Sequence, residues 1–265
     1  MQINSQFDGG NIRCIKCEDP SDVQLEIKQD HNSDFYQWFY FRVTGAKGVA
    51  SRFNILNAKG AAYEEGWDDY QAVASYDREF WFRVPTEYKN GIVQINHTPE
   101  YESIYYAYFA PYSIERCADL VSWAIEDTRV KLRVLGQTLD GQDLDQLIIG
   151  EPAAQKKKIW VHARQHPGET MASWWMEGFL HRLLNDDDAL SRALLDKAVF
   201  YVVPNMNPDG SSRGHLRTNA AGANLNREWL EPSMERSPEV FLVREQMQKL
   251  GIDICLDVHG DEALP

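Results

Sequence analysis

The chain has 265 residues, and its 27 Lys and Arg against 40 Asp and Glu give a formal net charge of −13. This acidic balance disfavours a nucleic-acid binder, which needs a basic surface, and equally disfavours docking to an anionic membrane. No apolar run is long enough to span a bilayer, and the first residues lack a secretion signal. We therefore expect a folded cytoplasmic protein of about two domains, with no nucleic-acid or membrane partner. Its oligomeric state is not predicted.

The first part of the chain carries short stretches of alternating polarity, separated by clusters of Gly, Asn, Asp and Pro. These stretches predict strands at 23–29, 35–43, 51–56, 79–84, 91–97 and 103–109. Many short strands with regular turn signals indicate an antiparallel β-sandwich, which we assign to residues 1–113. Within its aromatic strand, alternation predicts that Phe39, Phe41 and Val43 face the core.

After Pro111 the pattern changes, and strands alternate with helices. The predicted helices lie at 113–128, 170–184 and 237–250, and the predicted strands at 131–139, 144–149, 159–163, 199–203 and 252–258. Such alternation is typical of an α/β domain with a mixed, mostly parallel sheet, which we assign to residues 114–265. The four cysteines, at positions 14, 17, 117 and 255, are too few for a disulfide scaffold, and we expect reduced thiols.

Two histidines and one glutamate lie where predicted strands end. His166 and Glu169 fall between a strand and a helix, and His259 follows a second apolar strand 90 residues after Glu169. Because ligands in open α/β sheets bind at the carboxyl ends of strands, these side chains can share one space. His₂Glu is a known catalytic zinc set, so we predict Zn²⁺ bound by these three residues. For the rival ligand His162, inside the strand, we expect a structural role.

A long segment rich in Gly and Asn, residues 205–229, separates the two halves of this predicted site. Long ordered loops in compact domains are commonly functional. The segment contains three arginines, and an arginine can bind a carboxylate through two parallel hydrogen bonds.

Together, these motifs resemble the zinc metallocarboxypeptidase family and, within it, the cytosolic carboxypeptidase-like subfamily. The resemblance rests on HPGET at 166–170, NPDG at 207–210, LNREW at 225–229 and DVHG at 257–260, with QWFYFRV at 37–43 and YFAPYS at 108–113. It implies hydrolysis of C-terminal residues of peptides or proteins, with glutamate as a possible preference. It also implies that Asn226 and Arg227 bind the substrate's terminal carboxylate, and that Arg217 is catalytic, steadying the oxyanion.

Two departures from the family pattern stand out. Asn224 occupies the place of an aspartate that, in the digestive branch, supports a zinc histidine, which we read as a mark of the subfamily. The family's general-base glutamate has no counterpart up to Pro265, and we do not assign that role to Asp261 or Glu262. We therefore expect that the catalytic domain is truncated and that the base lies beyond Pro265. Two alternatives stay open, namely a zinc deacylase of N-acyl amino acids and a non-catalytic module that binds peptide tails.

Overall fold

The computed structural model describes residues 1–261, whose contacts divide the chain into two compact units. The first unit comprises Met1–Pro111, Ser211–Arg217 and Asp261, and the second comprises Tyr112–Gly210 and Thr218–Gly260. The sequence analysis assigned residues 211–217 to the second domain, whereas their contacts group them with the first unit. Among the described residues, no helix is long and apolar enough to cross a membrane.

The first unit is built from two five-stranded sheets. One sheet has the order β1 (Gln2–Asn4), β4 (Tyr40–Thr44), β10 (Ser103–Ala107), β6 (Val73–Ser75) and β7 (Phe82–Arg83). The other has the order β2 (Arg13–Lys16), β3 (Val23–Glu26), β5 (Ser51–Ile55), β9 (Ile92–His97) and β8 (Thr86–Lys89). All pairings are antiparallel except β3 with β5. Short 3-10 helices lie at Pro20–Asp22, Ala58–Gly60 and Glu64–Trp67.

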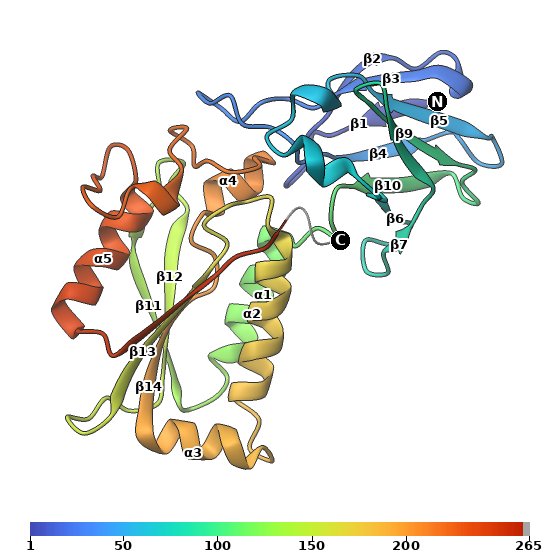
Figure 1. Ribbon diagram of the computed structural model, residues 1–265. Coiled ribbons are helices and arrows are strands. Elements are labelled where there is room, and N and C mark those ends of the chain that lie inside the picture. The colour runs from blue at the N-terminus through green and yellow to red at the C-terminus, as the bar shows by residue number, and fades with distance from the viewer. Residues whose placement is uncertain (262–265) are drawn as a thin grey trace. The chain divides into compact units, whose positions relative to one another are not determined.

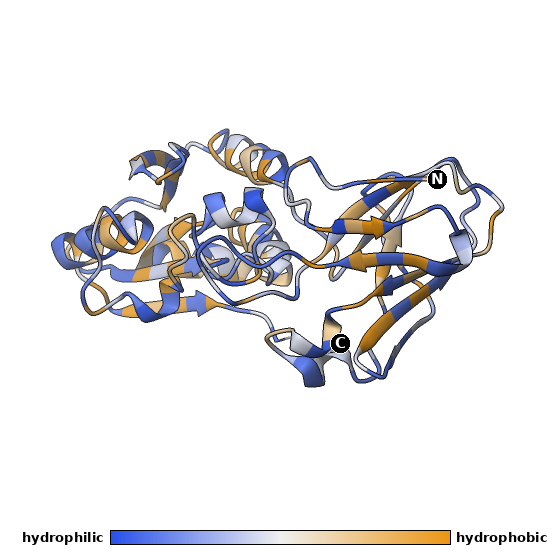
Figure 2. Cartoon of the chain, turned by 90° about the horizontal axis from the view of Figure 1, so that it is seen from above, coloured by the Kyte–Doolittle hydropathy of each residue, from blue (hydrophilic) through white to orange (hydrophobic). Residues whose placement is uncertain are grey.

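An aromatic core joins these two sheets. The ring of Phe53 on β5 lies 5.9 Å from that of Phe41 on β4 and 5.0 Å from that of Tyr106 on β10. Phe39, Phe41 and Val43 are fully buried, which confirms the predicted core face. Figure 2 shows the hydrophobic residues of this unit gathered on its strands. Packing of two sheets through one apolar layer is the sandwich arrangement that the sequence predicted.

The opposite face of this aromatic strand is covered at Trp38 and Tyr40, although Arg42 on β4 is exposed. Trp38 and Tyr40, which the alternation placed away from the core, are only 3% and 5% exposed. The indole of Trp38 donates to the carbonyl oxygen of Gly9, and the ring of Tyr40 packs edge-on against Phe7 at 4.9 Å. The N-terminal segment therefore covers part of a face that the alternation alone would predict to be exposed to solvent.

The second unit has one mixed sheet of five strands covered by helices on both faces (Figure 1). The strand order is β11 (Val130–Gln137), β12 (Asp143–Ile149), β14 (Ala198–Val203), β13 (Lys157–Ala163) and β15 (Ile254–Val258). The helices are α1 (Ile114–Ala124), α2 (Thr170–Leu183), α3 (Ala189–Lys197), α4 (Pro208–Arg213) and α5 (Pro238–Leu250), with a 3-10 helix at Leu225–Arg227. Two pairings are parallel, β13 with β14 and with β15, and two are antiparallel.

Each face of this sheet has its own core. Apolar residues of α1 and α2 pack on one face, and those of α5 pack on the other (Figure 1). Helix α1 begins where predicted, because the hydroxyl of Ser113 accepts the backbone N–H of Arg116 at 3.0 Å, which caps its first turn. The periodicity did not reveal α3, and the Gly- and Asn-rich segment contains α4 where we expected only a loop.

Candidate metal centre

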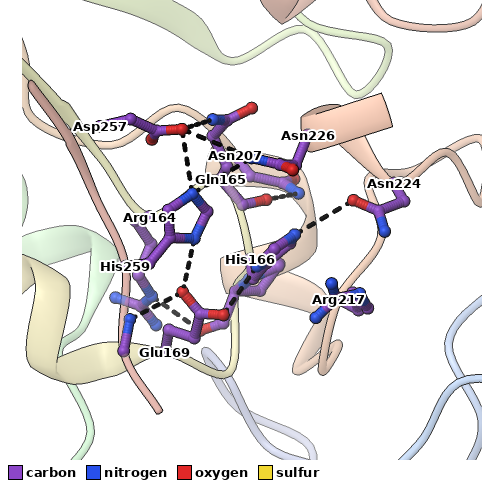
Figure 3. Close-up of polar contacts among 12 residues, drawn as sticks. Arg164, Gln165, His166, Glu169, Asn207, Arg217, Asn224, Asn226, Asp257 and His259 are labelled. Atoms are coloured by element: carbon purple, nitrogen blue, oxygen red, sulfur yellow. Dashed lines mark hydrogen bonds and ion pairs between the residues drawn. The ribbon is translucent and has the colours of Figure 1, made fainter. Parts of the chain in front are cut away.

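Three side chains of ligand type meet at one edge of the second unit's sheet. Strands β13 and β15 run parallel, with Ala163 paired to Val258, so the segments that follow them leave the sheet at the same edge. His166 and Glu169 lie between β13 and α2, and His259 follows β15 directly. The structure thus brings the three predicted zinc ligands together (Figure 3).

The carboxylate of Glu169 lies between two imidazole rings. Its Oε1 is 2.7 Å from Nδ1 of His166, and its Oε2 is 2.9 Å from Nδ1 of His259. Ligand atoms of the three residues all lie within 4.8 Å of one another. His166 and Glu169 are buried, while His259 is partly exposed. Two imidazole nitrogens and one carboxylate, with one side open, are the donor set of a catalytic zinc site.

The outer nitrogens of both histidines have acceptors of their own. Nε2 of His166 lies 3.1 Å from Oδ1 of Asn224, and Nε2 of His259 lies 3.0 Å from Oδ2 of Asp257. An Nε2–H that donates outward leaves the Nδ1 lone pair to face the centre, and such outer partners set the tautomer of metal-binding histidines. The residues therefore fit a zinc ion in tautomer and orientation as well as in type.

The charges of this centre shift the pKa values of Glu169 and His259. Burial alone would raise the pKa of Glu169, but hydrogen bonds with His166 and His259 outweigh it and lower that pKa to about 2. Hydrogen bonds to Asp257 and Glu169 raise the pKa of His259 to about 10. A metal ion that binds here must displace the proton on His259 Nδ1, so binding releases a proton.

Asp257 links the ligand strand to the loop that carries His166. One of its oxygens accepts from Nε2 of Gln165 at 2.6 Å as well as from His259, and the other lies 3.1 Å from Nδ1 of His162. Partial desolvation would raise the pKa of Asp257, but hydrogen bonds from the two histidines outweigh it and hold that pKa well below its usual range. His162 is buried against Trp229 and lies outside the converging set, as expected for a structural role.

The sequence analysis gave no role to Asp257 or Gln165. The sequence does contain a sign of the role of Asp257, which lies two residues before His259. That spacing places both side chains on the same side of an extended segment.

A buried arginine shapes the loop before the first ligand, and it too was missed. Arg164 has a φ of 63°, in the left-handed region that favours glycine, and it is only 3% exposed. Its guanidinium donates to the carbonyl oxygens of Pro167 and Tyr112, at 2.7 and 3.2 Å, and to the hydroxyl of Ser173 at 3.1 Å. These bonds fix the turn that directs His166, and strained backbone of this kind commonly occurs at functional sites.

The NPDG motif has an architectural role. The side-chain oxygen of Asn207 accepts the backbone N–H of Gly210 at 3.0 Å, and Asp209 accepts from the hydroxyl of Thr138 at 2.6 Å. Both side chains are fully buried. A Cβ on Gly210 would lie 2.5 Å from the carbonyl oxygen of Thr218, so only glycine fits. The motif holds the start of the long segment and provides no group to the metal cluster.

The predicted carboxylate clamp lies beside the metal cluster. Asn226, in the 3-10 helix Leu225–Arg227, has its Nδ2 3.2 Å from Nε2 of His259. The guanidinium of Arg227 donates to Oδ1 of Asn226 and is exposed. An exposed guanidinium with a neighbouring amide can bind a carboxylate through directed, charge-assisted bonds.

Arg217 belongs to the first unit, and its described contacts are with that unit. Its backbone N–H donates to Oδ2 of Asp30 at 2.8 Å, and its guanidinium donates to the hydroxyl of Tyr63. Its catalytic role remains a prediction from the resemblance.

Both parts of the chain match known protein families. Residues 3–109 match a family described as the cytosolic carboxypeptidase N-terminal domain, and residues 121–262 match the zinc carboxypeptidase family. Mouse cytosolic carboxypeptidase 1 is 29% identical over 311 residues, which cover 98% of this chain and 25% of that protein.

Solved structures are similar over the whole chain. A metallo-carboxypeptidase from Pseudomonas aeruginosa is 48% identical with a TM-score of 0.97, and the match covers 100% of this chain and 71% of the other. A metallo-carboxypeptidase from Burkholderia cenocepacia is 49% identical with a TM-score of 0.97, again over 100% of this chain and 71% of the other. The first of these was solved in complex with (2-guanidinoethylmercapto)succinic acid.

Proposed function

Because the chain belongs to the zinc carboxypeptidase family, we propose that it forms the metal site and carboxylate clamp of an enzyme that removes C-terminal residues from peptides or proteins. The observation that carries the proposal is the convergence of His166, Glu169 and His259, with Nδ1 of each histidine directed at the shared carboxylate. Membership of this family supports metallocarboxypeptidase activity.

His166, Glu169 and His259 would hold the zinc ion, which when bound polarises a carbonyl and lowers the pKa of a water ligand to about 7. Asn224 and Asp257 keep the two imidazoles oriented by accepting from their outer nitrogens. The first acceptor is a neutral amide and the second is a carboxylate, so the two histidines differ in basicity.

Asn226 and Arg227 would bind the terminal carboxylate of the substrate, since they offer a positive charge and directed donors. Arg217 would donate to the oxygen of the scissile carbonyl as it becomes negative. A donor of this kind is typically worth about 3 to 4 kcal/mol in the transition state. This assignment is supported by the resemblance of Arg217 and its motif to the family.

We also propose a cytoplasmic location and glutamate as the C-terminal residue to test first, on the basis of the similarity to cytosolic carboxypeptidases. The general base stays a prediction from the resemblance, and Glu262 lies outside the described residues.

Zinc content of the purified chain, measured by elemental analysis, tests the metal site. We expect about one zinc ion per chain, lost in His166→Ala and kept in His181→Ala. His181 is the matched control, because it lies exposed on α2 and outside the ligand cluster. Equal zinc content in His166→Ala and the wild type would overturn the site.

Binding of peptide ligands tests the clamp without requiring turnover. We expect Arg227→Ala to weaken a zinc-loaded chain's affinity for a peptide with a free C-terminus by about 10- to 100-fold, because a charge-assisted bond is lost. A C-terminally amidated peptide serves as the control and should bind wild type and variant equally weakly.

Preferential cleavage of N-acyl amino acids over peptides would instead identify the deacylase, and binding of peptide tails without cleavage would indicate the non-catalytic module.

A further inference from the structure

A short part of the long segment is built into the first unit. Residues 211–217 are covalently joined to the second unit at both ends, yet their contacts are with the β-strand unit. The carbonyl oxygen of Ser212 accepts from Gly9 N–H at 2.9 Å, and that of Gly214 accepts from the amide of Asn11 at 2.8 Å. Gly214 has a φ of 71°, and a Cβ there would lie 2.7 Å from the carbonyl oxygen of Gly9. The backbone of this segment is therefore fixed closely.

One buried carboxylate holds the end of the segment. Oδ1 of Asp30 accepts the N–H of Leu216 at 2.7 Å, and Oδ2 accepts the N–H of Arg217 at 2.8 Å. Asp30 is only 3% exposed, and Leu216 is buried in the aromatic core of the first unit. Bonds from consecutive amides to one charged acceptor are strong, and their loss would leave two N–H groups without an acceptor.

The side chain of Arg217 is fixed by the same unit. Its guanidinium lies 5.6 Å from the ring centre of Phe35 and 5.7 Å from that of Tyr63, whose hydroxyl it also contacts. The buried side-chain amide of Gln37 in turn holds the backbone of Tyr63. Its oxygen accepts the N–H of Tyr63 at 2.8 Å, and its nitrogen donates to the carbonyl oxygen of Tyr63 at 2.9 Å. Hydrogen bonds therefore fix both the backbone N–H and the guanidinium of Arg217.

We propose that Asp30 is a positioning residue for Arg217, the arginine proposed to stabilise the oxyanion. This inference rests on the proposed function of Arg217. A preorganised donor loses much of its effect when it moves, since a displacement of about 1 Å can reduce a rate about 100-fold.

The test compares two ligands of the zinc-loaded chain. One is a peptide phosphonate with a free C-terminus, whose tetrahedral group mimics the oxyanion, and the other is 3-phenylpropionate, which offers a carboxylate and no second carbonyl. We expect Asp30→Asn to weaken binding of the phosphonate about tenfold, because one of two charged acceptor bonds is lost, and to leave binding of 3-phenylpropionate unchanged. Backbone hydrogen exchange at Leu216 and Arg217 should become faster. Tyr63→Phe, which keeps the ring, should also weaken only the phosphonate.

Asp77→Asn is the matched control, because Asp77 accepts the backbone N–H groups of Glu79 and Phe80, at 2.8 and 2.9 Å, in the same unit. It should change neither affinity. In an Arg217→Ala background, Asp30→Asn should cause no further loss of phosphonate affinity, whereas a merely structural effect would add to it. Equal weakening of both ligands, additive losses, or no loss would each overturn the inference.

The two proposals fail in different ways. If Arg217→Ala binds the phosphonate as well as the wild type, the proposed role of Arg217 is wrong, and the inference falls with it. If Arg217→Ala weakens the phosphonate while Asp30→Asn and Tyr63→Phe do not, only the inference is wrong.

Discussion

A buried glutamate behind the long segment gives a prediction about stability that can be worked out in detail. Glu239, in the first turn of α5, is fully buried. Its oxygens lie 3.1 and 3.4 Å from the amide nitrogen of Asn219. Burial is the main cause that raises the pKa of Glu239 to about 7, and the negative charges of Asp209 and Asp140 raise it further.

The sign of the effect follows from where the proton is held. Because the pKa of Glu239 is higher in the folded state, the folded chain binds more protons, so stability falls as the pH rises. The stabilising contribution is fully present below the unfolded pKa of 4.5 and is lost as the pH rises through about 7. A difference of roughly 2.5 units at 1.36 kcal/mol each gives a loss of about 3 kcal/mol.

Glu239→Gln removes this titration. We expect the free energy of unfolding of the variant, relative to that of the wild type, to rise by about 3 kcal/mol between pH 4.5 and pH 8. Urea denaturation of both chains across this pH range measures the difference. A chelator is present, so that the metal site is empty in both chains. Glu245→Gln, at an exposed position on the same helix, is the control and should show no such trend. Parallel curves for Glu239→Gln and the wild type would refute the reasoning.

Two further changes probe the metal site and the motif that supports it. Asn224→Asp places a negative charge on the group that accepts from Nε2 of His166, and we expect it to tighten zinc binding about tenfold. Competition with a chelating indicator measures this affinity, and an unchanged value would contradict the prediction. Gly210→Ala puts a methyl group 2.5 Å from the carbonyl oxygen of Thr218 and from the ring of Pro167. It should lower the free energy of unfolding by about 1 to 3 kcal/mol, as measured by urea denaturation. A variant as stable as the wild type would show that the backbone can shift to accommodate the methyl group.

The sequence could indicate the three converging residues because each lies shortly after a strand, a position that a local pattern can reveal. A histidine just after an apolar strand indicates the carboxyl end of a sheet, and His259 follows β15 directly while His166 lies three residues after the end of β13. That their strands are direct neighbours, β13 beside β15, depends on pairing between residues about 95 positions apart. Periodicity contains no information on such pairing, which is why the spacing suggested a shared site without establishing it.

Apart from α3, the elements that sequence analysis missed are short. Strands β1 and β6 have three residues each, which is too few for alternation to be recognised. Helix α4 begins at Pro208 in a stretch of Asp, Gly and Ser, whose composition is typical of a turn. It forms nevertheless because the buried side chains of Asn207 and Asp209 hold it to the rest of the unit. Tertiary bonds override local propensity there.

Burial separates the polar residues that build the long segment from those that would act on a substrate. Asn207, Asp209 and Asn219 are fully buried, and each accepts hydrogen bonds from neighbouring N–H or hydroxyl groups. Asn226 and Arg227 belong to the same polar segment, yet Asn226 is partly exposed and Arg227 is exposed. A buried polar group is retained only if its partners satisfy it, whereas an exposed one stays available to a ligand.

Sequence alone gives both groups the same appearance, because the chemistry that anchors a loop is the chemistry that binds a carboxylate. The buried group should therefore respond to substitution through stability and the exposed group through ligand affinity. Asp30 is the informative exception, since it is buried like an anchor but holds the arginine proposed to act on the substrate. For that residue, a change in ligand affinity without a change in fold is the distinguishing result.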